Sequence, residues 1–343
     1  MREHGGLDSL RIEDIPVPRP GPGEALVRVR AVGLNNLDIW ARSGPPGGRP
    51  VYPWTERRLP AVTGVDVAGV VEQVGPGTGE MAAGERVVIN PILCCGRCEF
   101  CLAGEQSMCR EYRIFGEHTP GGMAEFTVAP AGNLMKIPSA VAFEQAAATP
   151  VCCTTAWRMV VTTGRLRAGE DLLVVGASGG VGSAALVVGR RAGARVFALV
   201  GGPEKAAKAE RLGAVPIDRV RYPRFSERVR ELTASGVHVA ADPVGAPTWP
   251  ESIRSLRPGG RMVICGATGG ERPSIDIREI YQRHRQILGA PMGNLTDFQT
   301  VMGLVFRGEL TPVIHTVLPL SEIREAHRLF EAREHFGKVV LVP

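Results

Sequence analysis

Lysine is rare in this chain. The 343 residues include 40 lysines and arginines, and only four of these are lysine. The formal net charge at pH 7 is +5, and the arginines are scattered along the sequence instead of forming a block. Binding to nucleic acid needs a concentrated basic patch. We therefore expect no nucleic-acid partner for this protein.

Long hydrophobic runs are missing as well. No apolar run reaches the roughly 18 residues of a membrane-spanning helix, and the first residues, MREHGGLDSL, lack the apolar centre of a signal peptide. We expect no membrane partner and a cytoplasmic location. Aromatic residues make up only 5% of the chain, but hydrophobic residues make up 44%. A chain of this length and composition can bury a sizeable core, which excludes a disordered or fibrous protein.

Cysteine is distributed unevenly. Five of the eight cysteines lie between positions 94 and 109, and four of them, Cys95, Cys98, Cys101 and Cys109, form the pattern C-x2-C-x2-C-x7-C. Four thiolates at this spacing can converge on one tetrahedral zinc ion. Because a closed shell of four sulfurs leaves no position for water, we predict a structural zinc. Cys94 is the alternative first ligand in place of Cys95.

Two other interpretations of the cysteine cluster fit less well. The bacterial ferredoxin pattern for an iron–sulfur cluster places its fourth cysteine after three residues and a proline behind it. Here the gap is seven residues and Arg110 follows. Disulfides are rare in cytoplasmic proteins. A zinc lobe over residues 94–110 is therefore the preferred interpretation.

The pattern of apolar residues changes near position 147. Residues 1–146 contain runs rich in valine and isoleucine between glycine and proline turns, which predicts a β-rich domain. Over residues 147–285, short apolar runs alternate with amphipathic stretches, which is typical of a parallel sheet with helices on both faces. Residues 286–343 contain one clear amphipathic helix, at 321–333, and a short final strand. We predict an α/β protein in which a doubly wound domain is inserted into a β-rich domain.

A glycine-rich turn lies near the start of the inserted domain. It follows the apolar run DLLVVGA and precedes an apolar helix, and its spacing is G-x-x-G-x-x-G. Glycines in this context let the chain turn sharply and let a pyrophosphate approach the helix N-terminus. A tight turn that binds no ligand is the alternative. The residues that we expect to contact the dinucleotide here are Gly176, Ser178, Gly179, Gly180 and Val181.

The second strand of the inserted domain favours NADP over NAD. NAD enzymes place an acidic residue at the end of this strand to hold the ribose hydroxyls, but the strand here ends in ALVGG. Lys205 follows shortly, and Arg219 lies beyond the next strand. These two cationic side chains, with no acidic residue at the end of the strand, suit the 2′-phosphate on the ribose of NADP. NAD is the second choice, because Glu204 is close enough in sequence to reach the ribose.

Together, these features resemble the medium-chain dehydrogenase/reductase superfamily over nearly the whole chain. The segments that carry the resemblance are EALVRVRAVGLNNLD, VTGVDVAGVVEQVGPG, CGRCEFCLAGEQSMC, the GASGGVG turn and FGKVVLV. The resemblance implies a GroES-like catalytic domain interrupted by a Rossmann domain. It also implies a small-molecule substrate and a homodimer or homotetramer. The chain is similar to the quinone-oxidoreductase and enoyl-reductase branches, yet it keeps the zinc lobe of the alcohol dehydrogenases.

The resemblance also bears on a catalytic zinc. The zinc-dependent alcohol dehydrogenases place a cysteine at the position of Asn35 and a histidine at that of Val65, and their third ligand falls near Val151. These replacements imply that the catalytic zinc is absent. The alternative is a shift of register that makes Cys152 or Cys153 a ligand.

Without that metal, the chain is expected to reduce an activated double bond. The resemblance implies transfer of hydride from NADPH to the C=C bond of an α,β-unsaturated carbonyl, an enoyl thioester or a quinone, and the developing enolate then needs a hydrogen-bond donor. The expected catalytic residues are Asn35, Asp66 and His118. In zinc-free relatives, the amide at position 35 helps to position nicotinamide or substrate. Asp66 is expected to pair with a nearby cation in the emptied metal site.

Further residues are assigned to the cofactor cleft by the resemblance. They are Thr155, Gly266 and Met292. The loop at 43–60 is expected to border the substrate pocket. Two other functions stay open: a zinc-dependent alcohol dehydrogenase that uses Asp66 with Cys152 or Cys153, and a non-catalytic protein that binds NADPH.

Overall fold

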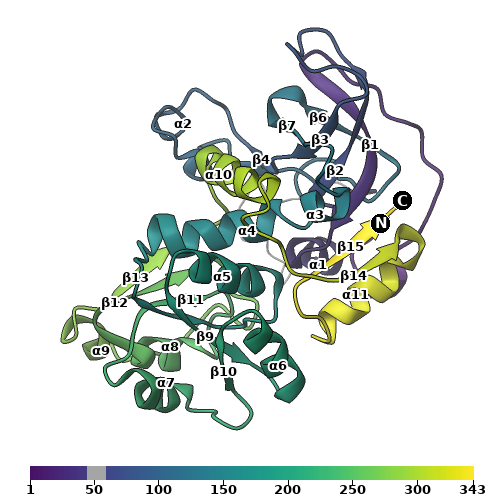
Figure 1. The fold of residues 1–343 in the computed structure, drawn as a ribbon. Helices are drawn as coiled ribbons and strands as arrows, with labels where there is room; N and C mark the ends of the chain where they lie inside the picture. Colours follow the sequence, from purple (N-terminus) through teal and green to yellow (C-terminus); the bar gives the residue numbers. More distant parts are fainter. Residues whose placement is uncertain (45–58) are drawn as a thin grey trace. The chain divides into compact units, whose positions relative to one another are not determined.

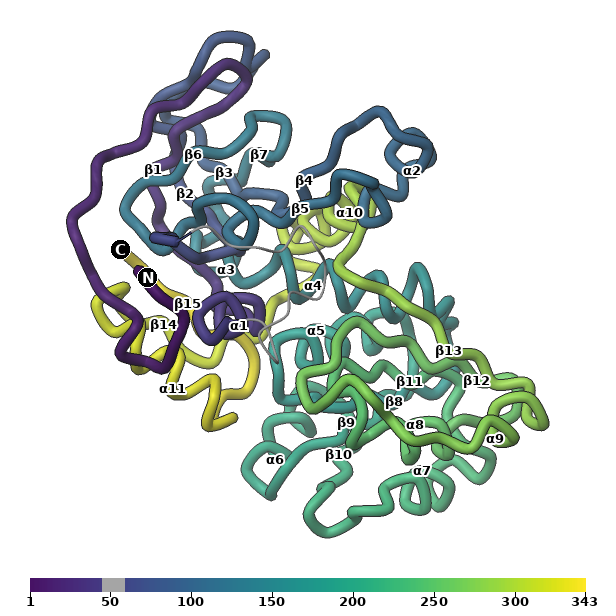
Figure 2. The backbone as a smooth tube through the Cα atoms, turned by 180° about the vertical axis from the view of Figure 1, so that it is seen from behind, coloured from purple at the N-terminus to yellow at the C-terminus, as the bar shows by residue number. Residues whose placement is uncertain are grey.

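The computed structural model describes residues 1–44 and 59–343, and these residues divide into two compact units (Figures 1 and 2). The first unit consists of Met1–Val151, Asn294–Glu309 and Ile314–Pro343, and the second of Cys152–Gly293 and Leu310–Val313. The first unit therefore contains both ends of the chain. This confirms the predicted fold class, in which an α/β domain interrupts a β-rich one. The predicted boundaries, after residues 146 and 285, lie a few residues before the observed ones.

The first unit is built on a sheet of seven strands in the described residues. The strands are β1 (Glu24–Gly33), β2 (Asp66–Val74), β3 (Arg86–Ile89), β6 (Phe126–Pro130), β7 (Leu134–Lys136), β14 (Ile314–Pro319) and β15 (Lys338–Val342). Their order is β14-β15-β1-β2-β3-β7, with β6 also paired to β1. The pairs are antiparallel except for β14 and β15. Strand β1 is central, and Gly33 at its end lies opposite Asp66 on β2 and Val340 on β15.

The first unit also contains helices. They are α1 (Asn36–Ser43), α2 (Glu99–Leu102), α3 (Phe143–Ala147), α10 (Leu295–Phe306) and α11 (Ile323–Glu331), with the small strands β4 (Ile92–Leu93) and β5 (Arg113–Ile114) and 3₁₀ turns at Leu7–Ser9, Gln106–Met108, Ala131–Asn133 and Leu320–Glu322. Helix α4 (Pro150–Trp157) contains the boundary between the units. The one clear amphipathic helix that the sequence shows after residue 291 is α11, and the structure has α10 there as well. Helix α10 is apolar along most of its length, so it lacks the amphipathic period that reveals α11.

The second unit contains a parallel sheet of six strands. The strands are β8 (Asp171–Val174), β9 (Arg195–Val200), β10 (Val215–Asp218), β11 (Val237–Asp242), β12 (Leu256–Ile264) and β13 (Gln286–Gly289), in the order β10-β9-β8-β11-β12-β13. The helices are α5 (Gly180–Arg191), α6 (Pro203–Arg211), α7 (Phe225–Thr233), α8 (Trp249–Ser255) and α9 (Arg278–Tyr281), and Arg158–Thr163 forms a π-helical turn after α4. This is the doubly wound order of dinucleotide-binding folds, whose ligands bind where the strand order reverses. Here that point lies at the carboxyl ends of β8 and β11.

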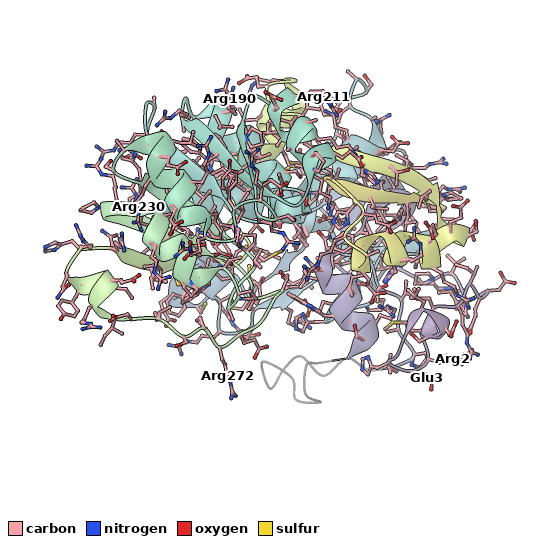
Figure 3. All side chains as sticks on the ribbon, turned by 90° about the horizontal axis from the view of Figure 1, so that it is seen from below. Arg2, Glu3, Arg190, Arg211, Arg230 and Arg272 are labelled. Atoms are coloured by element: carbon pink, nitrogen blue, oxygen red, sulfur yellow. The ribbon has the colours of Figure 1, made fainter. Side chains whose placement is uncertain are left out.

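Charged side chains are spread over the helices and loops of the second unit. Arg190, Arg211 and Arg230 project from α5, α6 and α7, and Arg272 lies in the loop before α9 (Figure 3). All four are exposed. This spread matches the scattered positions of arginine in the sequence. No helix in residues 1–44 and 59–343 combines the length and apolarity needed to cross a membrane.

Candidate functional site

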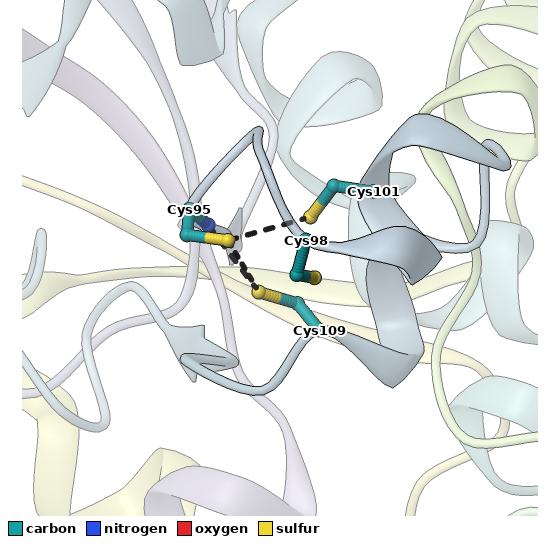
Figure 4. Close-up of side chains that lie close together, drawn as sticks. All are labelled: Cys95, Cys98, Cys101 and Cys109. Atoms are coloured by element: carbon teal, nitrogen blue, oxygen red, sulfur yellow. Dashed lines mark hydrogen bonds between the residues drawn. The ribbon is translucent and has the colours of Figure 1, made fainter.

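Four cysteine side chains converge in the lobe around α2 (Figure 4). The sulfur atoms of Cys95, Cys98, Cys101 and Cys109 lie within 4.8 Å of one another. The Sγ atoms of Cys95 and Cys109 are 3.5 Å apart, and those of Cys95 and Cys101 are 4.0 Å apart. Sulfurs bound at about 2.3 Å to one tetrahedral zinc stand roughly 3.8 Å from each other. The four residues predicted from the spacing therefore fit a zinc ion, and the exposed Cys94 is not among them.

Backbone N–H groups face the sulfurs of this cluster. The N–H of Arg110 makes the largest contribution in lowering the pKa of the Cys98 thiol to about 6. The N–H groups of Cys95 and Glu111 donate to Cys109 Sγ at 3.3 Å each, whereas burial raises the pKa of Cys109. Since the thiolate is the form that binds a metal, these donors prepare the sulfurs for an ion. None of the eight cysteines, all within the described residues, forms a disulfide.

A second polar centre lies where the zinc-dependent relatives are expected to bind their catalytic metal. Lys338 Nζ is 2.9 Å from Asp66 Oδ2 and 2.7 Å from Asn35 Oδ1. Asn35 Nδ2 donates to Asp66 Oδ2 at 3.0 Å and to the carbonyl oxygen of Gly33 at 3.1 Å. The N–H of Val151 donates to Asp66 Oδ1 at 2.9 Å. We call the three side chains of Asn35, Asp66 and Lys338 the buried network.

The prediction that Asp66 pairs with a cation is confirmed, and Lys338 is that cation. The side chains of Asp66 and Lys338 are 0% and 2% exposed. An ion pair removed from water to this extent needs further hydrogen bonds on its remaining atoms, and Asn35 and Val151 supply them. Lys338 was not expected from the sequence. The available signal was a single lysine at the start of the apolar run KVVLV.

Three strand ends and one helix N-terminus bring the buried network together. Asp66 begins β2 and Lys338 begins β15, and both strands pair with β1 at Gly33. Asn35 is the N-cap residue of α1. A Cβ atom at Gly33 would lie 2.4 Å from the carbonyl oxygen of Ala147 and 3.0 Å from Lys338 Cε. Glycine at this position therefore makes the close approach of the lysine possible.

A second carboxyl group, that of Asp38, adjoins the network. It is 1% exposed. Its Oδ2 accepts the N–H of Asn35 at 2.9 Å and its Oδ1 accepts the N–H of Gly64 at 3.0 Å. Burial raises the pKa of Asp38 to about 6, against the effect of these donors and of Lys338. Asp38 was not expected from the sequence, although N-x-x-D before a helix is a capping-box signal that could have revealed it.

The contacts of Asn35 limit what its amide can do. Both Nδ2 hydrogens are engaged, with Asp66 and Gly33, so the amide has no hydrogen left for a substrate in this arrangement. Val65, at the expected histidine position, is 1% exposed and offers no ligand atom. In this part of the first unit, the polar side chains therefore bond to one another and to the backbone.

His118, another expected catalytic residue, follows β5 in a loop and is half-buried. Its Nδ1 accepts the N–H of Ile114 at 2.9 Å. A neutral imidazole that accepts at Nδ1 carries its proton on Nε2. The loop thus fixes the tautomer and places the proton of the neutral ring on Nε2, which is a buried atom.

The glycine-rich turn of the second unit lies between β8 and α5. Gly176 has a φ of +62°, and a Cβ atom at Gly182 would lie 2.2 Å from the carbonyl oxygen of Gly176. The turn therefore requires glycine twice, once for the left-handed backbone and once for close packing of the helix. The N-cap of α5 is Gly179, which has no capping side chain, so the first N–H groups of the helix suit an anion. The other expected residues of this turn are Ser178, Gly180 and Val181.

Both expected cations lie near the ends of the first two strands. Lys205 Nζ is 3.5 Å from Ser178 Oγ in the turn. A Cβ atom at Gly201, just after β9, would lie 3.3 Å from Nε of Arg219. The structure thus places Lys205 beside the glycine-rich turn and Arg219 beside the end of β9, where a nucleotide ribose binds in this fold.

The acidic residues near this point are engaged elsewhere. Glu204 forms an ion pair of 2.8 Å with Lys208 one turn further along α6, and its side chain is 83% exposed. Asp218, at the end of β10, accepts the N–H groups of Gly202 and Val220 at 3.0 Å each, and the Gly202 donor lowers its pKa most. Glu204 therefore lies on the surface beside Lys208, and Asp218 is engaged with backbone N–H groups.

Thr155 and Met292, both assigned to the cofactor cleft by the resemblance, lie together. Thr155 Oγ1 is 4.0 Å from Met292 Sδ. Gly266 lies in the loop after β12, where an added Cβ atom would be 3.3 Å from the carbonyl oxygen of Pro243. Residues 45–58 of the loop expected to border the substrate pocket lie outside the described residues.

Asp242, which ends β11, was not expected from the sequence. Its Oδ1 accepts the N–H groups of Val244 and Gly245 at 2.9 and 3.2 Å, and its Oδ2 accepts the hydroxyls of Thr248 and Ser252 at 2.7 Å each. One carboxylate thereby shapes the loop at the point where the strand order reverses. The available signal was an acidic residue at the end of the apolar run VHVAAD.

Comparisons with known proteins agree with both units. The model of the alcohol dehydrogenase GroES-like domain matches residues 21–139, and that of the zinc-binding dehydrogenase matches residues 180–307. The alcohol dehydrogenase of Geobacillus stearothermophilus is 30% identical over 97% of this chain and 96% of its own length. The chain belongs to the medium-chain dehydrogenase/reductase superfamily.

Other members of the superfamily that resemble this chain carry two kinds of name. The acryloyl-coenzyme A reductase of Sulfurisphaera tokodaii is 28% identical over 99% of this chain and 98% of its own length. A solved structure named NAD-dependent alcohol dehydrogenase is 41% identical, covers 100% of this chain and 98% of its own, and superposes with a TM-score of 0.93. This superfamily member is an NAD(P)H-dependent oxidoreductase.

Proposed function

We propose that this oxidoreductase uses NADPH to reduce the C=C bond of an α,β-unsaturated carbonyl, an enoyl thioester or a quinone, and that it works without a catalytic zinc. The observation that carries the proposal is the buried network. An amide and a valine stand at two expected ligand positions, and the carboxylate of Asp66 is already neutralised by Lys338. A zinc ion in this place would have to displace the ammonium group and break its hydrogen bonds, which is costly in a buried site.

The nucleotide site supports NADPH. When bound, this cofactor supplies the hydride. Gly176 and Gly182 give the turn the shape that lets a pyrophosphate approach α5. Lys205 and Arg219 offer two cations to a 2′-phosphate, and such charge-assisted hydrogen bonds are among the stronger ones. NAD is the weaker candidate because β9 ends without an acidic residue to hold the ribose hydroxyls.

His118 is our candidate proton source for the reduced product. Its Nδ1 is held by the N–H of Ile114, so its proton lies on Nε2 in the neutral ring. After hydride reaches the β-carbon, the enolate oxygen needs a donor and the α-carbon needs a proton. The role of Asn35 in the proposal is to hold Asp66 and Lys338 in place, because its amide hydrogens are engaged with them and with Gly33.

The cysteine cluster is proposed to hold one structural zinc. Cys95, Cys98, Cys101 and Cys109 would fill its coordination shell, which leaves no open position for a substrate. The ion would hold the lobe in shape and take no part in the reduction.

Turnover and metal content test the proposal together. We expect NADPH oxidation with a 2-enoyl thioester, an enone or a quinone, no oxidation of simple alcohols, and one zinc per chain by elemental analysis. Oxidation of simple alcohols with no turnover of any activated double bond would overturn it. Tight NADPH binding without any turnover would favour the non-catalytic alternative.

The choice of nucleotide can be tested with a matched pair of lysines on α6. Lys205→Ala should weaken NADPH binding roughly 10-fold or more, because a hydrogen bond to a charged group contributes about 1.5–3 kcal/mol, and it should leave NADH binding unchanged. Lys208→Ala is the comparison variant, because it removes a lysine of the same helix and releases Glu204 from its ion pair, so it should not weaken NADPH binding as Lys205→Ala does. Fluorescence titration measures both constants. An equal loss for NADPH and NADH would contradict the assignment.

A zinc-dependent alcohol dehydrogenase is the second candidate, favoured by the 41% identical solved structure of that name. It would use Asp66 with Cys152 or Cys153 and would contain two zinc ions per chain. Elemental analysis distinguishes the two candidates. The predicted homodimer or homotetramer and the cytoplasmic location also stay predictions, and light scattering of the purified protein tests the former.

A further inference from the structure

The loop after β11 is bound to the last residue of its own strand. That residue, Asp242, is 0% exposed. Its Oδ1 accepts the N–H groups of Val244 and Gly245, and its Oδ2 accepts the hydroxyls of Thr248 and Ser252. Ser252 lies in α8, and Thr248 directly precedes that helix. The carboxylate therefore joins the end of β11, the loop and the following helix, all within the second unit.

This arrangement uses the full acceptor capacity of a carboxylate. An ionised aspartate offers two oxygens with about four lone pairs between them, whereas asparagine offers one oxygen and an NH₂ group that donates. The four donors to Asp242 are neutral backbone and hydroxyl groups. Because a buried charge is costly unless hydrogen bonds compensate for it, these four bonds hold the carboxylate, and with it the loop, in place.

Val244, which donates its N–H to Asp242, packs against the glycine-rich turn. An added Cβ atom at Gly176 would lie 2.9 Å from Val244 Cγ2. The carbonyl oxygen of Val244 accepts the N–H of Gly269, in the loop after β12, at 2.7 Å. The backbone of Val244 is thus fixed at its N–H and at its carbonyl group, and one of its methyl groups lies against the turn.

Gly176 organises the turn that Val244 contacts. Its carbonyl oxygen accepts the N–H of Gly179 at 3.0 Å, and a Cβ atom at Gly182 would lie 2.2 Å from the same oxygen. Gly179 is the N-cap residue of α5. A displacement of Gly176 would therefore move the start of α5, which a pyrophosphate approaches in this fold.

We propose that Asp242 is a positioning residue for the nucleotide: by holding Val244 against Gly176, it keeps the glycine-rich turn in the shape that binds a pyrophosphate. Contiguous hydrogen bonds and packed side chains carry energetic coupling of this kind. The inference rests on the proposed function only in that the turn binds a pyridine nucleotide. It holds for NADPH and NADH alike, because both contain the pyrophosphate.

Asp242→Ala tests the inference. It removes the acceptor for the N–H groups of Val244 and Gly245, so the loop loses its attachment to the end of β11. We expect the dissociation constants for NADPH and NADH to rise by a common factor of roughly five or more. In the absence of nucleotide, hydrogen exchange should become faster at the amide of Gly179. Asp242→Asn keeps an oxygen for the two backbone N–H groups and should retain most of the affinity.

Asp171→Ala is the matched control for a loss of stability. Asp171 is a buried aspartate of the same unit and forms an ion pair of 2.7 Å with Arg195. It begins β8, whereas the glycine-rich turn follows the end of that strand. We expect this variant to lower the unfolding midpoint and to leave both dissociation constants as in the wild type. An equal loss of affinity in Asp171→Ala and Asp242→Ala would overturn the inference, because lost stability alone would then explain it.

Val244→Ala is a second test, which does not depend on whether Asp242→Ala folds. It removes the methyl group that lies against Gly176 and leaves the acceptor oxygens of Asp242 in place. We expect weaker binding of both nucleotides and faster exchange at Gly179. In the double variant Asp242→Ala/Val244→Ala, the loss of affinity should be smaller than the product of the two single losses, because both act through one contact. Independent losses that multiply in full would contradict the inference.

The measurements are fluorescence titration with each nucleotide and hydrogen exchange followed by mass spectrometry. Neither requires turnover, so failure to reduce any double bond would contradict the proposed reaction and leave this inference standing. Unchanged affinity in Val244→Ala would overturn the inference. A loss of affinity in Asp242→Asn as large as that in Asp242→Ala would overturn it as well.

Discussion

The cysteine cluster and the buried network lie in the same unit and differ in what they leave open. The cluster brings together four groups that can each become an anion, with no cation among its four members. The network contains a carboxylate, an amide and an ammonium group that satisfy one another. The comparison teaches that two groups of ligand-type residues differ in charge balance: the four thiols could hold a metal ion, whereas Asp66 already has a cationic partner. Each of the following predictions changes one side of this comparison.

The largest effect is expected from Lys338→Met. It leaves the carboxylate of Asp66 buried without its partner, which typically costs about 3–5 kcal/mol in the free energy of unfolding. Urea denaturation measures this cost. The double variant Lys338→Met/Asp66→Asn, which removes both charges, should recover much of the loss. If the double variant is no more stable than the single one, charge balance is not what the network provides.

A smaller effect is expected from Cys101→Ser in the cluster. It should reduce the zinc content from one per chain to near zero. An ion present at about 100 times its dissociation constant contributes about 2.7 kcal/mol to stability, and the variant should lose an amount of this order. Cys94→Ser is the control, because Cys94 is exposed and lies outside the four converging sulfurs. Equal loss of zinc in both variants would mean that the ligand set is different.

The third effect is a dependence on pH beside the buried network. Burial raises the pKa of Asp38 to about 6 from an ordinary value of 3.8. Between about pH 4 and 6 the folded protein therefore holds a proton that the unfolded chain has released, so the free energy of unfolding falls as the pH rises. In Asp38→Asn this fall should disappear, and the variant should gain relative to wild type between pH 4 and 7. Parallel stability curves for the two proteins would contradict the assignment.

The smallest effect is expected from Glu99→Gln on the surface of the lobe. Glu99 and Arg110 form an ion pair of 2.6 Å, but their side chains are 53% and 71% exposed. Water and salt screen such a pair. We expect the zinc content and the unfolding midpoint to stay as in wild type. A clear loss of zinc would show that this surface pair takes part in holding the cluster.

Much of the fold, the glycine-rich turn and the convergence of the four cysteines could be predicted because the signals are local. The alternation of strands and helices, the turn at Gly176 and the spacing of the four cysteines each lie within one short stretch of sequence. Helix α10 was not predicted because its apolar residues show no amphipathic period. The roles of Asp38 and Asp242 were not predicted, because these roles depend on burial and on backbone N–H donors. Residue type alone reveals neither.

The sequence by itself determined that a zinc-type cysteine pattern is present and that two of the expected catalytic ligands are replaced. Only the tertiary structure decided which side chains occupy the expected position of the catalytic metal. Lys338 reaches Asp66 across 272 positions and Asn35 across 303. The strand order β15-β1-β2 creates this meeting, and the glycine at position 33 leaves room for it. Spacing along a chain describes groups that lie close in sequence, whereas a buried ion pair between distant strands depends on the register of the whole sheet.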